Sequence, residues 1–152
     1  MNLFDAMNEF TERAGIGRVA PDETGGAALL FDREHEVSFV PEEGGSVCLQ
    51  CEIGDADRLG ADGCRALLEA SFSETDGAAF AIHRALGKVV LWKRFGEFAS
   101  GADLEQAVSG FLGLVIAWKA RLASGDIGGN GAPPVHGAPD TLGGLAGRFM
   151  VV

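Results

Sequence analysis

The order in which helical and strand-like patterns of apolar residues follow one another restricts the fold of this chain more than any other feature. The first helical stripe consists of Leu3, Met7, Phe10 and Ala14. These spacings place the four side chains on one face of a helix over residues 3–14. Asn2 is a candidate N-cap, and Gly15 can end the helix because glycine adopts a left-handed conformation at little cost.

Five runs of apolar residues predict strands, and these runs form two groups with connections of hairpin length. The runs are residues 27–32, 36–41, 46–53, 79–84 and 88–95. A short helix is predicted over 61–71, and a long one from Ser100 or Asp103 to about Ala123. Because strands are grouped rather than alternating singly with helices, the sequence predicts an α+β fold. Its order is helix, three-strand antiparallel meander, helix, two-strand hairpin and long C-terminal helix.

The composition changes after residue 124. Residues 125–152 contain eight glycines and three prolines among 28 positions, with no long apolar period. We therefore expect a folded domain over 1–124 and an appended tail over 125–152. The end of the tail is more apolar, at Leu142, Leu145, Phe149 and Met150. Our hypothesis is that 125–141 form a tether, and that these four residues dock weakly on an apolar patch as a displaceable cover.

Charge and cysteine content bear on the class of partner and on the compartment. The net charge is −10, which argues against nucleic acid and anionic membrane surfaces, because both attract basic proteins. No apolar run approaches the roughly 20 residues that cross a bilayer, the longest being 111–118. Residues 1–5 show no signal-peptide pattern, and three cysteines suit a reducing compartment. We expect a cytoplasmic protein without membrane insertion.

Cys48 and Cys51 have the C-x-x-C spacing of metal and redox sites. They fall in a predicted strand, where residues three apart point to opposite faces. Two such thiols could not share a metal ion or form a disulfide, so we interpret both cysteines as structural.

The remaining candidates for chemistry are equally unspecific. His35, His83 and His136 lie in a turn, a strand and the tail, at no ligand spacing from one another. Residues 125–131 resemble a phosphate loop in glycine content but lack the Lys-Ser/Thr that follows one. We expect no catalytic residues, no metal and no cofactor, and we interpret the chain as a binding protein rather than an enzyme.

The predicted last helix is apolar almost all round, at Phe111, Leu112, Leu114, Val115 and Ile116. Contact with one sheet face accounts for only part of this surface. The excess indicates a dimer interface or a groove for a partner, since exposed apolar patches usually have an occupant.

This pattern resembles the Tir-chaperone (CesT) class of type III secretion chaperones. The similarity is carried by residues 66–72, 77–82, 87–92, 104–111 and 118–119, and by the opening helix with residues 28–32. These segments match the family's leucine-rich short helix, its glycine-containing loop and hairpin, and its long last helix with tryptophan near the end. The resemblance covers residues 1–124 and none of the tail.

The resemblance implies a homodimer in the bacterial cytoplasm that binds the N-terminal segment of one secretion effector and keeps it non-globular and soluble for export. Residues implied to contact the effector are Leu3, Phe4, Met7, Phe10, Phe31 and Phe39. Residues implied at or near the dimer interface are Cys64, Leu67, Leu68, Phe80, Ile82 and Trp92.

Two other functions stay open. An anti-activator of the same fold would bind a regulatory protein through the same apolar surfaces. A small α+β enzyme or ligand-binding domain would instead need a pocket between helix and sheet, and a closed apolar pocket lined by His83 and acidic residues would favour it.

Overall fold

A computed structural model describes residues 1–127 and the backbone of residues 149–151. In chain order the elements are α1 (Leu3–Arg13), β1 (Ala27–Phe31), β2 (His35–Pro41), η1 (Glu43–Gly45), β3 (Val47–Asp55), η2 (Ala56–Arg58), α2 (Gly60–Ser73), β4 (Ala79–His83), β5 (Lys88–Phe95), α3 (Gly101–Ser124) and β6 (Phe149–Val151). The predicted α+β order is confirmed, and the bounds of the predicted helices and strands agree to within about two residues.

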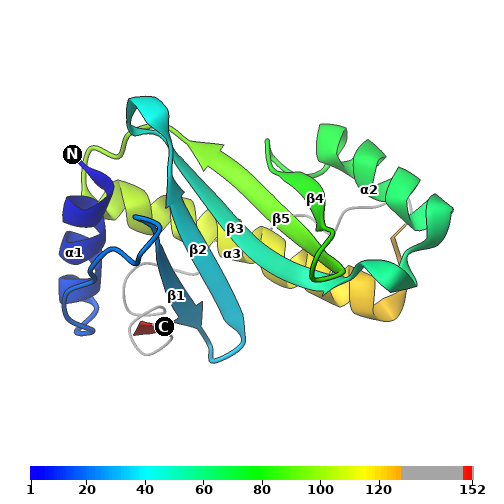
Figure 1. The fold of residues 1–152 in the computed structure, drawn as a ribbon, viewed down its shortest axis with the longest axis horizontal. Coiled ribbons are helices and arrows are strands. Elements are labelled where there is room, and N and C mark those ends of the chain that lie inside the picture. Colours follow the sequence, from blue (N-terminus) through cyan, green and yellow to red (C-terminus); the bar gives the residue numbers. More distant parts are fainter. Residues whose placement is uncertain (128–148, 152) are drawn as a thin grey trace.

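The strands form one antiparallel sheet in the order β4-β5-β3-β2-β1-β6. Figure 1 shows α3 running across one face of this sheet, α1 beside the start of α3, and α2 beside β4 at the other end. No helix among the described residues crosses the opposite face, which we call the open face. The described helices therefore cover the sheet on one side only, as an antiparallel sheet allows.

Strand register decides which side chains meet α3. Residues paired across antiparallel strands share a face, and the face alternates along each strand. The buried pairs include Leu29 with Val37, and Phe39 with Leu49. Strands and helices both contribute to the core, and the largest fully buried side chains of the described residues are Phe10, Phe31, Phe39, Phe111, Met7, Leu29, Leu49, Leu91, Leu104, Val37, Val89 and Val108.

The first and last helices approach each other closely at Gly101. A Cβ atom on Gly101 would lie 2.8 Å from the Phe10 nitrogen and 3.0 Å from the Ala6 carbonyl oxygen, so glycine permits this packing. The Gly101 N–H donates to Glu9 Oε2 at 2.7 Å, which satisfies a free donor at the start of α3. Arg13 at the end of α1 pairs with Glu105 on α3 at 3.2 Å. These contacts fix α1 against the helix that covers the sheet.

Local signals fix the helix ends. The Asn2 side chain accepts a hydrogen bond from the Asp5 N–H, which confirms the predicted N-cap. Ser100 rather than Asp103 caps α3, accepting from the Asp103 N–H. Gly125 ends α3 in the left-handed conformation at φ 73°.

The length of α3 bears on the expectation about membranes. No uninterrupted apolar run of the sequence approaches the length of a membrane span, whereas the 24-residue helix α3 is long and apolar enough to cross a bilayer by length and composition. In the fold, Leu104, Phe111 and Trp118 on α3 are buried in the core. The apolar character of α3 is thus used at least in part in packing.

The tail differs from its prediction in one respect. Residues 128–148, which contain His136, Leu142 and Leu145, lie outside the described residues. The backbone of β6 pairs with β1, a strand that the sequence pattern did not predict. The division into a domain of 1–124 and a tail of 125–152 stays a prediction.

Candidate partner-binding surfaces

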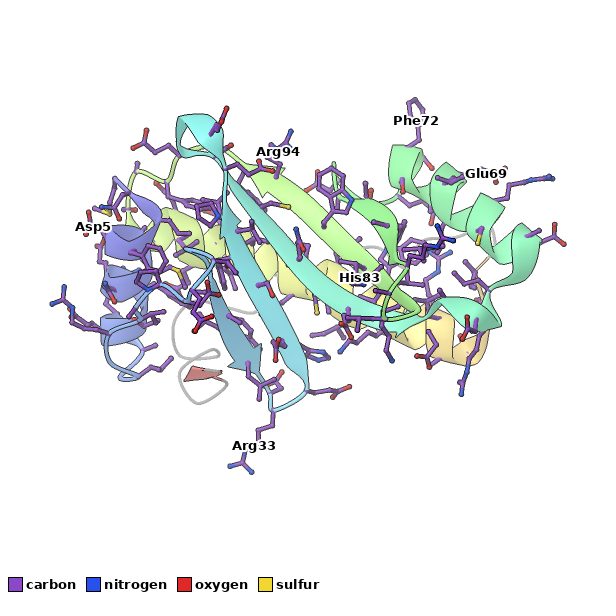
Figure 2. All side chains as sticks on the ribbon, viewed as in Figure 1. Asp5, Arg33, Glu69, Phe72, His83 and Arg94 are labelled. Atoms are coloured by element: carbon purple, nitrogen blue, oxygen red, sulfur yellow. The ribbon has the colours of Figure 1, made fainter. Side chains whose placement is uncertain are left out.

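Exposed apolar side chains gather at the α2 end of the molecule. Among the described residues, the large apolar side chains that are exposed are Met1, Val40, Leu68, Phe72, Ile82, Leu86 and Ile116. Four of these seven lie on α2, on β4 or in the turn after β4. We call Leu68, Phe72 and Ile82 the α2–β4 surface, with exposed fractions of 70%, 96% and 51%. Figure 2 shows Phe72 pointing away from the body of the molecule.

The surface follows from how α2 packs. Leu67 and Ala70 point inward and are buried, whereas Leu68 and Phe72 lie one turn apart on the outer side of the helix. Arg65 and Glu69 beside them are exposed. The outer side of α2 is therefore apolar and is left exposed by the rest of the described chain.

The turn between α2 and β4 is held by polar contacts. Thr75 is buried, and its hydroxyl contacts the carbonyl oxygens of Ser71 and Ala78. The Ser71 hydroxyl accepts from the Phe80 N–H of β4 at 3.3 Å. These bonds tie α2 to β4, so the two elements hold their exposed apolar residues in a fixed relative orientation.

A cluster of aromatic and charged side chains connects α2 and β4 to α3. The Phe80 ring meets the edge of Trp118 at 4.7 Å between centroids, and the Arg121 guanidinium lies 3.9 Å from the Trp118 ring centroid. Arg121 also pairs with Glu74 at the end of α2, at 2.8 Å. Because the Arg121 side chain is only 12% exposed, this pair is shielded from solvent more than an ordinary surface ion pair. The cluster therefore anchors the α2–β4 unit to the core.

The open face carries a groove rather than a closed pocket. The groove has a volume of about 740 Å³ and is open to solvent. His83, Glu36, Glu52, Lys88 and Lys119 are among the residues that line it. The groove that His83 lines is therefore open and mostly polar, unlike the closed apolar pocket that would favour an enzyme. No group of three or more His, Cys, Asp or Glu side chains that could hold a metal ion occurs among the described residues.

The strand position of the two cysteines is confirmed. Cys48 is paired in register with Arg94, and Cys51 with Leu91 on the opposite face of β3. Burial raises the pKa of the Cys51 thiol to about 11 and also raises that of Cys48. Both thiols are therefore protonated at neutral pH and behave as small apolar side chains.

Comparison with known proteins gives a family. The family model of the Tir chaperone protein (CesT) family matches residues 5–119. The chain belongs to the CesT family. No curated protein sequence matches the chain.

Solved structures agree with this membership. A chain of the crystal structure of the ExsC–ExsE complex is 26% identical, with a TM-score of 0.67 over 79% of this chain and 96% of that chain. A chain of the HopA1–SchA chaperone–effector complex has the same fold at 11% identity and a TM-score of 0.64, over 76% of this chain and 91% of that one. The Yersinia pestis complex of the type III secretion chaperone SycH with a fragment of YscM2 shows it at 17% identity and 0.58, over 76% and 98%.

The CesT family is a family of type III secretion chaperones, which bind effectors or other protein partners and are not enzymes. Members are soluble cytoplasmic proteins. These statements hold for the family, and the function proposed for this chain is based on them.

The six residues that the resemblance implies at a dimer interface occupy different depths. Leu68 and Ile82 are exposed, whereas Cys64, Phe80 and Trp92 are half-buried and Leu67 is buried. Leu67 faces the core of its own chain, and Phe80 packs on Trp118. The prediction of an interface here stays a prediction.

Phe72 is the most exposed apolar residue of this surface, and it was not among the predicted interface residues. Its position four residues after Leu68 is the signal that could have found it, because residues at i and i+4 share one side of a helix.

The six residues implied to contact an effector are mostly in the core. Leu3, Met7, Phe10, Phe31 and Phe39 are buried, and Phe4 is half-buried. In this conformation only Phe4 has an appreciable part of its side chain open to a partner. Contact of these residues with an effector stays a prediction, and for the buried five it would require the chain to open.

Proposed function

We propose that this CesT-family chain is a cytoplasmic homodimeric chaperone that binds the N-terminal segment of a type III secretion effector and keeps it non-globular and soluble for export. It acts by binding and not by catalysis. The observation that carries the proposal is the apolar α2–β4 surface, which a monomer exposes to water at Leu68, Phe72 and Ile82.

Self-association is the simplest use of that surface. β4 is an edge strand that, in the described part of the chain, pairs with β5 alone. A second copy placed on this edge would cover the apolar side chains of both protomers with the same residues, as a two-fold interface does. The net charge of −10 keeps such a protein soluble while it presents apolar surface.

Client binding is supported by the fold relatives. The HopA1–SchA structure is a chaperone–effector complex, and ExsC and SycH are likewise found with a protein partner. An extended client segment gains main-chain hydrogen bonds at sheet edges and places apolar side chains in grooves, and this mode needs no nucleotide or metal.

The test has two parts. Light scattering of the purified chain at micromolar concentration should give twice the 15.8 kDa chain mass. Affinity purification of the tagged chain from its native cell, with the tag alone as control, should recover one secreted protein. Deleting the N-terminal segment of that protein should abolish its recovery. A partner that still binds without its N-terminal segment would contradict the proposal, and so would a chain that stays monomeric.

A second candidate is an anti-activator of the same fold that binds a regulatory protein. The similarity to a chain of the ExsC–ExsE complex, at the highest identity among the structures above, favours keeping it. The same purification separates the two, because an anti-activator would recover a regulator of transcription instead of a secreted effector.

A further inference from the structure

The last described strand closes an edge of the sheet with the chain's own C-terminal segment. β6 pairs antiparallel with β1, with Phe149 opposite Phe31, Met150 opposite Leu30 and Val151 opposite Leu29. The 21 residues of 128–148 separate this strand from Ile127, so the pairing is long-range in sequence.

The β1 edge is distinct from the edge proposed for self-association. The sheet ends at β4 on one side and at β6 on the other, beyond β1. Without β6, β1 would present a row of unpaired backbone N–H and C=O groups, which is a template for any extended chain. A strand that adds to such an edge gains main-chain hydrogen bonds, with specificity from its alternate side chains.

The pairing with β6 is short relative to the strand that it covers. β1 has five residues, Ala27–Phe31, and the register with β6 includes Leu29, Leu30 and Phe31. Ala27 and Ala28 have register partners on β2, but among the described residues neither has one on β6. A longer incoming strand could therefore make more pairs along β1 than β6 makes.

We infer that Phe149–Val151 is a built-in competitor of the client: it pairs with the β1 edge in the free chain and is displaced when an extended, antiparallel client segment with apolar residues opposite Leu29 and Phe31 adds to that edge. The inference rests on the proposed function in taking the natural occupant to be the client segment. The strand β6 thereby covers an otherwise unpaired sheet edge while no client is bound.

The tether sets how strong this competition is. Because β6 is part of the chain, its local concentration at β1 is on the order of millimolar and does not depend on protein concentration. If the edge is about 90% occupied by β6, an external segment binds about tenfold more weakly than to a vacant edge. The same figures give a free tail peptide a Kd on the order of 100 μM for the vacant edge.

The experiment uses the full chain and a peptide of its own tail. Met150→Pro removes a backbone N–H and is poorly tolerated within a paired strand, so it should vacate the edge. Met150→Leu is the matched control, because it keeps both the N–H and the apolar character. The probe is a fluorescein-labelled peptide of residues 142–152, and the control probe carries the same Met150→Pro change. Binding is measured by fluorescence anisotropy.

We expect the probe to bind the Met150→Pro chain about tenfold more tightly than the wild type or the Met150→Leu chain, and the control probe to bind none of them. Hydrogen exchange of residues 27–31 should be faster in the Met150→Pro chain than in the wild type, and should slow again when the probe is added. Equal probe affinity for all three chains would overturn the inference. Failure of the probe to bind any chain, or unchanged exchange at 27–31, would do so as well.

This test is independent of the effector. If the probe behaves as expected but no secreted protein is recovered in the purification, the edge site stands and the proposed client is wrong. If a secreted protein is recovered and binds the wild type and Met150→Pro chains with equal affinity, the proposed function stands and the competitor role of β6 is wrong.

Discussion

Phe72 offers the sharpest test of self-association, because the single chain makes almost no use of it. Its side chain is 96% exposed on α2. Phe72→Ala should therefore leave the folded monomer unchanged, since surface substitutions away from specific contacts alter the free energy of unfolding by about 0.5 kcal/mol or less. In a two-fold dimer through the α2–β4 surface, however, the change removes two buried phenylalanines at once.

The magnitude follows from burial. Covering one exposed phenylalanine stabilises an interface by about 1.5–3 kcal/mol, so losing most of two should cost about 4 kcal/mol. At about 1.4 kcal/mol per tenfold, the dimer Kd should rise roughly a thousandfold. Sedimentation equilibrium from nanomolar to micromolar concentration measures this Kd directly.

Ile116→Ala is the matched control. Ile116 is 43% exposed on α3 and is not part of the α2–β4 surface, so its truncation should leave the Kd unchanged. Leu68→Asp should dissociate the dimer even more completely, because it places an unpaired charge in the interface. An unaltered Kd for Phe72→Ala would refute the assignment of this surface to the dimer, provided that circular dichroism shows a folded chain.

Three further outcomes are expected. Arg121→Ala should lower the free energy of unfolding in urea by about 1–3 kcal/mol, because it removes both the Glu74 pair and the contact with Trp118. The control is Arg18→Ala, which breaks an exposed pair with Glu12. Equal losses of unfolding free energy in the two variants would contradict the anchoring role of Arg121. The double variant Cys48→Ser with Cys51→Ser should keep partner binding. In the wild type the half-buried Cys64 should react first with thiol reagents at pH 8, since burial raises the pKa of the other two thiols. Stoichiometric zinc in the wild type that is lost in the double variant would show that the strand argument is wrong. The hydrogen bond from Arg94 lowers the pKa of Glu42 in the folded chain, so the stabilisation by this pair is present above the unfolded pKa and is lost as pH falls through the folded pKa. The difference in Tm between wild type and Glu42→Gln should therefore be largest at pH 7 and shrink below about pH 4. A difference in Tm that does not change with pH would contradict this prediction.

The resemblance to the family could be stated from sequence, but the depth of its residues could not. Phe31 and Phe39 lie in short apolar runs that suit either a core or a binding groove. The register of β1 with β2, and of β2 with β3, places both on the face covered by α3. A resemblance transfers positions, whereas exposure depends on which other elements cover them.

The sequence by itself determined the local structure of this protein. The apolar stripe of residues 3–14, the cap at Asn2 and the grouped strands each depend on residues only a few positions apart, so spacing was enough to predict them. Tertiary structure decided what faces outward and what closes the sheet. Phe72 is exposed because α2 packs through Leu67 and Ala70, and β6 lies on β1 because segments more than a hundred residues apart meet there. Such contacts depend on the arrangement of all the elements together, and no local pattern encodes it.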